Sequence, residues 1–415
     1  MGLPNVVRVK QQFDRTRLED PCGTVTAGLK KLGPAGRLKP GARVAITAGS
    51  RGINNLVAMT RAAADAVKSM GGQPFILPSM GSHGGATDEG QKNLLAELGI
   101  SEGSMGCPVL SSMQVVEIGR TAAGVPVYLD RHALQSDGII VINRVKPHTA
   151  FRGEVESGLC KMLAVGLGKH KGAQQMHAAG LGPTLVEAAR MILARAPVLA
   201  GIAVLENSLD QTAEIHVVPP ERFEETDRTL LRRAWQTLPR IPFDPLDVLI
   251  VDEMGKNISG TGMDNNVIGI GPRVGGKMEM GHPAVSTIVV LGLTPETHGN
   301  ANGIGLADLT TRRLVDSIDY KATYTNVLTT RLWSAGRLPV ILETDREAIE
   351  AAVGETPPDL IRLVRIKNTL HLEEVEISEA LAPEARQKGL ALVREARPFA
   401  FDGTGRLRPW KGQGE

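Results

Sequence analysis

The sequence predicts an α/β protein of two domains, each with a mainly parallel sheet flanked by helices, and an active site in the cleft between the domains. Three observations predict this class. The chain has 415 residues, which is more than one ordinary hydrophobic core accommodates. Apolar residues make up 42% of the chain but aromatic residues only 3%, so the core must consist of Val, Leu, Ile and Ala, as in buried parallel sheets. Its 47 glycines suit many tight turns between strands and helices.

Short apolar runs alternate with helical patterns in the first half of the chain. Apolar residues at helical spacing predict a helix over 55–70, which Gly71 and Gly72 end. Thr87 is a good N-cap for the next helix. The other elements predicted here are strands at 43–48 (RVAITA), 73–77 (QPFIL), 115–119, 125–129, 138–143 (GIIVIN) and 198–205, a helix-rich region at 157–196 and a polar helix at 220–238.

A proline-rich segment divides the chain. Residues 239–245 (PRIPFDP) are typical of a linker, and strand-like runs begin again beyond it, at 246–252, 286–293 and 339–342. We therefore expect an N-terminal catalytic and cofactor-binding domain over 1–243, a C-terminal α/β domain over 244–390, and a tail over 391–415 that packs back on the N-terminal domain.

Charge and cysteine content restrict the partners. Lys and Arg total 47 against 45 Asp and Glu, a net charge of +2 without a basic tract, which argues against nucleic acid. Cys22, Cys107 and Cys160 lack ligand-like spacing and cannot all pair, which favours a reducing compartment. Neither a signal-peptide pattern nor an apolar run of about 20 residues is present. We expect a cytoplasmic protein without a membrane partner, and the oligomeric state stays open.

Three loops that follow predicted strands carry Arg51, His83 and His148. In one parallel sheet all three loops would emerge at the carboxyl edge, where such sheets bind ligands. Two imidazoles facing one substrate can supply a general base and a general acid near neutral pH. A guanidinium beside a helix N-terminus suits a carboxylate or phosphate. The alternative for each is an ordinary histidine, or a solvated surface arginine, without a chemical role.

A basic cluster lies further along, at 157–177 (SGLCKMLAVGLGKHKGAQQMH). Its glycines and lysines do not form a Walker A sequence, so a phosphate loop is weakly indicated, and a solvated turn is the alternative. Lys161 stands between apolar neighbours and is expected to be more buried than Lys169 or Lys171. A desolvated lysine is a candidate for covalent chemistry.

Taken together, these loops resemble those of the lactate racemase family, whose members use a nickel-pincer nucleotide. That family carries a Thr-Arg loop, a Gly-x-His loop followed by threonine, a Pro-His loop, a lysine that anchors the cofactor and a histidine that ligates nickel. The matching segments here, in the same order, are Ser50-Arg51, GSHGGAT with His83, KPHTAFRG with Lys146 and His148, then Lys161, then His177. The resemblance covers residues 40–240.

The resemblance implies a racemase or epimerase of a 2-hydroxyacid that works by reversible hydride transfer. It implies that Lys161 holds the pincer nucleotide, with Ser50 and Lys146 also at the cofactor, and it leaves open whether the link to Lys161 is covalent. His177 would ligate nickel, His83 and His148 would be acid and base on opposite faces, and Arg51 would bind the reacting oxygen. The implied partners are a small 2-hydroxyacid and the proteins that build and insert the cofactor.

The sequence also departs from the family pattern. Glu154 and Glu156 lie near the implied nucleotide phosphate and would repel it unless they point away. Ala48-Gly49 replaces an acidic pair. The family's Gln and Lys for the substrate carboxylate have no clear match in the second domain, where the candidates are Asn257, Asn266, Arg273, Lys277 and His298.

Two other functions remain open. The same two histidines could serve a cofactor-independent hydro-lyase or proton-transfer epimerase. The protein could also bind an anionic nucleotide or a carboxylate without turnover.

Overall fold

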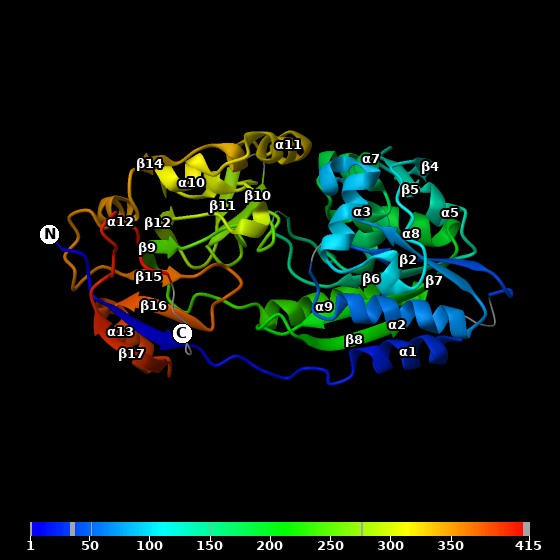
Figure 1. The fold of residues 1–415 in the computed structure, drawn as a ribbon, viewed down its shortest axis with the longest axis horizontal. Coiled ribbons are helices and arrows are strands. Elements are labelled where there is room, and N and C mark those ends of the chain that lie inside the picture. The colour runs from blue at the N-terminus through cyan, green and yellow to red at the C-terminus, as the bar shows by residue number, and fades with distance from the viewer. Residues whose placement is uncertain (1, 34–37, 51, 150, 275–276, 410–415) are drawn as a thin grey trace. The chain divides into compact units, whose positions relative to one another are not determined.

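The computed structural model describes residues 2–33, 38–50, 52–149, 151–274 and 277–409, and for 272–274 and 277–280 it describes the backbone alone. The chain forms two compact units, one of Asp14–Leu238 and one of Met1–Phe13 with Pro239–Glu415 (Figure 1). The chain leaves the unit Asp14–Leu238 at the start of the predicted linker. Each unit has one mainly parallel sheet with helices packed on it, which confirms the predicted α/β class.

The sheet of the unit Asp14–Leu238 contains the three strands on which the sequence prediction rested. Four neighbouring strands are parallel and the fifth is antiparallel. In spatial order they are β3 (Gln73–Pro78), β2 (Arg43–Ala48), β6 (Gly138–Arg144), β7 (Val198–Glu206) and β8 (Thr212–Val218). The edge strand β8 was not predicted, because only its first residue is fully buried and its sequence is mixed polar and apolar.

Helices and one hairpin complete this unit. They include a single π-helical turn, labelled η3, between two α-helices. The elements are α1 (Pro21–Leu32), α2 (Leu56–Ser69), η2 (Gly84–Ala86), α3 (Asp88–Glu97), α4 (Glu102–Met105), β4 (Val115–Arg120), β5 (Pro126–Asp130), α5 (Arg131–Leu134), α6 (Leu159–Lys161), η3 (Met162–Gly166), α7 (Lys169–Ala178), α8 (Gly182–Arg195), η4 (Pro220–Arg222) and α9 (Phe223–Thr237). Thr87 caps α3 by accepting a hydrogen bond from Gly90 N, as predicted.

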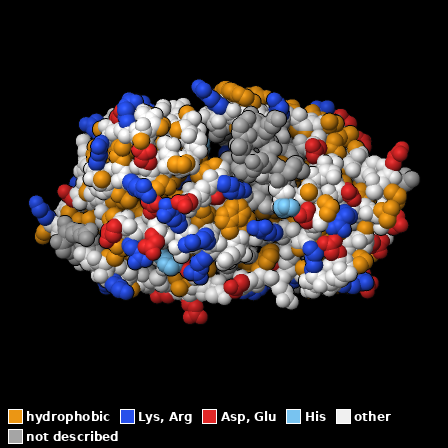
Figure 2. Space-filling model, turned by 180° about the vertical axis from the view of Figure 1, so that it is seen from behind, with side chains coloured by type: hydrophobic (Ala, Val, Ile, Leu, Met, Phe, Trp, Pro, Cys, Tyr) orange, Lys and Arg blue, Asp and Glu red, His pale blue; other side chains and the backbone are white. Residues whose placement is uncertain are grey.

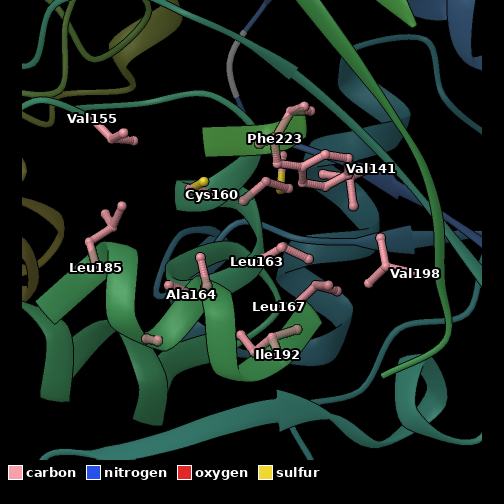
Figure 3. Packing of buried hydrophobic residues seen from close by; sticks show 14 of the residues in the cluster. Val141, Val155, Cys160, Leu163, Ala164, Leu167, Leu185, Ile192, Val198 and Phe223 are labelled. Atoms are coloured by element: carbon pink, nitrogen blue, oxygen red, sulfur yellow. The ribbon is translucent and has the colours of Figure 1, made fainter. Parts of the chain in front are cut away.

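The central strand β6 is buried on both faces. Ile139 and Val141 point into a core that α8 and α9 complete, and Figure 3 shows Val141 in that core near Phe223. Ile140 and Ile142, with the opposite parity, pack in a second core with α1 and α2. Because successive side chains of a strand alternate between faces, a strand covered on both sides must be apolar where it is buried, as Ile139–Ile142 are.

The other unit has an eight-stranded sheet whose first five strands are parallel and whose last three are antiparallel. In spatial order they are β14 (Val340–Leu342), β13 (Leu309–Thr311), β12 (Val285–Val290), β9 (Leu246–Val251), β15 (Leu363–Ile366), β16 (Glu374–Ser378), β1 (Val6–Lys10) and β17 (Ala391–Arg397). The remaining elements are β10 (Ile270–Val274), β11 (Lys277–Met280), η5 (Pro295–Thr297), η6 (Ile304–Leu306), α10 (Arg312–Asp316), α11 (Tyr320–Thr330), η7 (Trp333–Gly336), α12 (Asp345–Val353), η8 (Glu379–Leu381) and α13 (Ala382–Gln387).

Both ends of the chain differ from the predicted domain boundaries. We expected residues 391–415 to pack on the N-terminal domain, and 1–13 to belong to it, but β1 and β17 pair with each other in the second sheet. A buried carboxylate accounts for the arrangement. Glu376 on β16 accepts from Arg8 (3.0 Å), Arg365 (2.8 Å) and Arg397 (2.9 Å), one from each of three other strands. A buried carboxylate needs such partners, and only this pairing supplies all three.

The surface agrees with the balanced charge of the sequence. On the face drawn in Figure 2, Lys and Arg side chains are interspersed with Asp and Glu. Within the described ranges, the structure contains no helix that is both long and apolar enough to cross a membrane.

Candidate active site

The loops that carry the predicted histidines lie at one edge of the five-stranded sheet. Strand β2 lies between β3 and β6, and all three are parallel, so the segments after Ala48, Pro78 and Arg144 emerge side by side. From β2 the chain goes to β3 on one side, while β6 lies on the other. The strand order therefore reverses between β2 and β6, and ligands bind α/β sheets at such a switch point.

His83 is held by the loop that follows the neighbouring strand. Its ring nitrogen Nδ1 is hydrogen-bonded to the hydroxyl of Ser50, in the loop after β2. The side chain is half-buried. This contact engages Nδ1, which accepts or donates according to the tautomer of the ring. Ser50, predicted at the cofactor, is thus placed against His83.

His148 lies in the loop after β6, and its backbone is fixed independently of its ring. Glu156 accepts from the backbone N–H of His148 (2.8 Å) and of Gly153 (3.2 Å). The imidazole stacks at a tilt on Phe151, with ring centroids 4.5 Å apart. Burial, and then the positive charge of Lys161, holds the pKa of His148 well below its usual value of 6.5. The ring is therefore neutral at physiological pH and can accept a proton.

Lys146, Lys161 and His177 belong to the same electrostatic cluster as His148, because each contributes to lowering the pKa of His148. Lys161 ends α6 and is half-buried, as predicted. His177 lies in the last turn of α7 and is half-buried. Burial and Lys161 lower the pKa of His177 to about 4, so its imidazole is neutral and has a lone pair available for a metal.

The His83 loop also contacts the segment that contains Lys161 and His177. Gly81 N donates to Gly166 O across 3.3 Å, which joins the loop to the π-helical turn η3. A Cβ on Gly166 would lie 2.7 Å from the carbonyl oxygen of Ser79, so only glycine allows this approach. A Cβ on Gly81 would lie 3.2 Å from Cβ of Ala173, on α7. The structure therefore brings His83, His148, Lys161 and His177 to one edge of one unit.

The two acidic residues that depart from the family pattern are both engaged elsewhere. Glu156 is 2% exposed and faces the backbone N–H groups of its own loop. Glu154 is exposed and pairs with Arg228 at 2.6 Å. Glu154 therefore does not contribute the expected repulsion of a bound phosphate. Glu156 stabilises the His148 loop through its backbone hydrogen bonds.

The relative burial of the lysines was predicted wrongly. Lys169 is completely buried, whereas Lys161 is half-buried and Lys171 is exposed. Lys169 is the first residue of α7, and its backbone φ of 52° lies in the left-handed region. The ammonium lies 3.3 Å from Oδ2 of Asp130, which is also completely buried. Asp130, at the end of β5, makes burial of the charge possible together with the carbonyl of Pro78 and Oε1 of Gln91, and the local sequence does not reveal these partners.

Sequence reasoning also missed Asp227, which organises the start of the helix that contains Lys161. This buried carboxylate on α9 accepts from Leu159 N (2.9 Å) and Cys160 N (2.8 Å). Gly158, with φ of 85°, leaves room for it, because a Cβ there would lie 2.1 Å from Oδ1 of Asp227. Desolvation raises the pKa of Asp227 to about 7 although both backbone bonds favour the carboxylate. A polar residue on a helix gives no sequence signal for this role.

The raised pKa of Asp227 predicts a pH dependence of stability. The folded value is about 7 and the ordinary value 3.8, so the stability that this group contributes is complete below pH 3.8 and is lost as pH rises through 7. The expected loss is on the order of a few kcal/mol. Urea unfolding at several pH values between about 4 and 8 should show it.

The variant Asp227→Asn should remove most of this pH dependence, since an amide does not ionise in that range. Asp88→Asn, at an exposed position in the first turn of α3, is the matched control and should keep the wild-type slope. A wild-type slope in Asp227→Asn would contradict the assignment.

The remaining predicted residues are placed as follows. Arg51 lies outside the described residues, as do the side chains of Arg273 and Lys277 in the hairpin β10–β11. Asn257, Asn266 and His298 belong to the other unit. Asn257 accepts from Thr294 Oγ1 at 2.7 Å, Asn266 donates to Asp264 at 2.9 Å, and His298 is exposed. Their predicted contact with substrate stays a prediction.

Within the described ranges, no three His, Cys, Asp or Glu side chains are grouped so that they could hold a metal ion by themselves. The neutral imidazole of His177 offers one lone pair, and its predicted role as the nickel ligand stays a prediction. This donor set fits a group that brings its own metal ligands and needs one more from the protein, as the family resemblance implies.

Fold and site define an α/β protein whose parallel sheet presents histidines and lysines at its carboxyl edge. Residues 54–185 match the family described as the lactate racemase N-terminal domain. This match confirms the resemblance drawn from the loops of that region. No match was found among curated proteins.

Solved structures with the same fold are distant in sequence. A protein from Thermotoga maritima, a structural genomics target, is 14% identical with a TM-score of 0.53, over 85% of this chain and 98% of that one. The lactate racemase apoprotein from Thermoanaerobacterium thermosaccharolyticum is 10% identical with a TM-score of 0.49, over 88% of this chain and 99% of that one. The first of these likenesses shows the fold alone.

Proposed function

We propose that this protein is a racemase or epimerase of a 2-hydroxyacid that uses two histidines as acid and base. One observation carries the proposal: a neutral His148 lies in one electrostatic cluster with Lys146, Lys161 and His177, beside the loop in which Ser50 holds His83. The match to the lactate racemase N-terminal domain supports an isomerase of this type.

His177 and Lys161 would hold a nickel-pincer nucleotide, with Ser50 and Lys146 nearby. The low pKa of His177 supports this role, because a ligand must be deprotonated before it binds a metal. Imidazole suits nickel. When bound, the nucleotide would supply the acceptor for the hydride at carbon 2 of the substrate.

The two histidines would accept and donate the proton of the substrate hydroxyl. One neutral imidazole takes this proton as carbon 2 loses its hydride, which leaves a planar 2-keto acid. When the hydride returns to the opposite face, the other histidine, in its imidazolium form, returns a proton to the same oxygen, so one ring gains the proton that the other loses. No net oxidation results. The positive charges of Lys146, Lys161 and Arg152 around His148 would favour the anionic substrate throughout.

Metal content and intact mass test the cofactor. The protein, co-produced with cofactor-building proteins, is expected to carry nickel and a nucleotide-sized mass adduct, and Lys161→Ala should lose the adduct. Lys171→Ala, at an exposed position on α7, is the matched control and should keep both. A nickel-bearing adduct that survives Lys161→Ala would remove the covalent role of Lys161 but retain the cofactor.

A racemisation assay distinguishes the proposed function from the alternative functions. The enzyme is incubated with single enantiomers of short 2-hydroxyacids, lactate among them, and the products are resolved by chiral chromatography. Racemisation by protein without nickel or adduct would favour a proton-transfer epimerase, and loss of water would favour a hydro-lyase. Binding of a nucleotide without turnover of any acid would leave a non-catalytic binder.

A further inference from the structure

The ammonium group of Lys169 joins three segments inside the unit Asp14–Leu238. It donates to the carbonyl of Pro78 at the end of β3 and to Oε1 of Gln91 on α3 (3.1 Å), and it pairs with Asp130 (3.3 Å). The lysine and its two side-chain partners are all completely buried. Two of the three N–H donors of the ammonium are thus hydrogen-bonded, and Asp130 faces the ammonium as its counter-charge.

The lysine determines which way the amide of Gln91 points. Because Lys169 has no acceptor, only Oε1 of Gln91 can face it, and the amide nitrogen must point the other way. That nitrogen donates to Gly81 O (2.9 Å) and to His83 O (3.2 Å). The amide of Gln91 therefore binds two carbonyl oxygens of this loop, that of Gly81 and that of His83 itself.

The loop needs an external support of this kind. Gly81, Gly84 and Gly85 have φ values of 61°, 65° and 65°, and a chain so rich in glycine loses much conformational freedom when it is ordered. The backbone bonds within the loop are long: His83 N donates to Met80 O at 3.2 Å, Ala86 N to His83 O at 3.3 Å and Thr87 N to Gly84 O at 3.4 Å. The amide of Gln91 supplies two further bonds, from a helix that is capped and packed.

We propose that Lys169 and Gln91 are positioning residues for His83. The buried ammonium orients the amide, and the amide fixes the loop so that the imidazole meets Ser50 in one geometry. Neither residue touches the reacting atoms. The assignment of an acid/base role to His83 rests on the proposed function, whereas the support of the loop does not.

The variant Gln91→Glu isolates the support from the burial of Lys169. A carboxylate still accepts from the ammonium, but it has no N–H for Gly81 O and His83 O and would repel them. Gln91→Met, which fills a similar volume and donates nothing, is the second variant if the carboxylate prevents folding. Gln174→Glu, the same change at an exposed position on α7, is the matched control.

Two readouts on the cofactor-loaded protein test the inference. Amide hydrogen exchange in the peptide spanning 79–87 should become at least about tenfold faster in Gln91→Glu, while the β6 peptide is unchanged. For the 2-hydroxyacid that the wild type racemises, kcat should fall about 10- to 100-fold with KM nearly unchanged, because a displaced base costs rate rather than binding. Gln174→Glu should match the wild type in both.

Unchanged exchange in 79–87 in both Gln91 variants would overturn the inference. Equal acceleration in 79–87 and in β6 would also overturn it, since that result indicates a general loss of stability. If exchange rises in 79–87 alone but wild-type protein racemises no 2-hydroxyacid, the loop support stands and the proposed function fails. If exchange rises there while kcat is unchanged, the positioning role is overturned.

Discussion

Replacement of His148 by alanine is expected to slow racemisation by about 10²- to 10⁴-fold, the contribution typical of a positioned general acid or base. The fold should survive, because the backbone of the His148 loop is fixed by Glu156 and by a bond from Arg152 to the carbonyl of His148 (2.5 Å), not by the imidazole. The rate is measured from each pure enantiomer by chiral chromatography, with circular dichroism to check the fold.

His83→Ala should cause a loss of the same order, since each face of the substrate needs its own imidazole. In a single turnover, each variant should still oxidise the enantiomer whose base is intact. His216→Ala, on strand β8 and bonded to Glu214, is the matched control and should retain wild-type rates. Wild-type turnover in His148→Ala would remove that residue from the acid/base pair.

Replacement of Lys169 by methionine is expected to destabilise the protein by about 3–5 kcal/mol, the loss typical when one partner of a buried ion pair is removed. Asp130 would be left buried without its cation, although its other oxygen still accepts from His132 N (2.7 Å) and Ala133 N (3.1 Å). Lys171→Met, two residues further along α7 and exposed, should change stability by at most about 0.5 kcal/mol. Urea unfolding compares the variants.

The double variant Lys169→Met with Asp130→Asn separates the loss of charge from the loss of packing. Asparagine can still accept from the two N–H groups at the start of α5, and it removes the unpaired buried charge. We therefore expect the double variant to be more stable than Lys169→Met alone. A double variant that is as unstable as the single one would show that the ion pair is not the cause.

The sequence predicted the strands that position the site because their signal is local. Runs such as RVAITA and GIIVIN consist mainly of apolar residues, and they form β2 and β6 within one residue of the predicted bounds. Turn residues after them located the loops of Ser50, His83 and His148. The strands β1, β16 and β17 were not predicted, because charged residues interrupt their apolar patterns. The contacts of Arg8 and Arg397 with Glu376 form only across strands that are distant in the sequence.

Some residues of the candidate site could be predicted from the sequence and others could not. Histidines and lysines after buried strands could be chosen from the sequence, because parallel strands bring such loops to one edge of a sheet. Asp227, Gln91 and the burial of Lys169 could not, because each depends on a contact between segments far apart in the chain. Asp227 and Leu159 are 68 residues apart, and Lys169 and Gln91 are 78 residues apart.

By itself, then, the sequence determined the α/β class, the parallel strands of the first sheet and the loops that carry the candidate acid and base. Only the tertiary structure decided that both chain ends enter the second sheet, that Ser50 contacts His83, and that Lys169 is buried while Lys161 is half-exposed. The physical reason is that the spacing of apolar residues is a property of each local segment and can be read from the sequence. The burial of a charge depends instead on whether distant segments supply its partners.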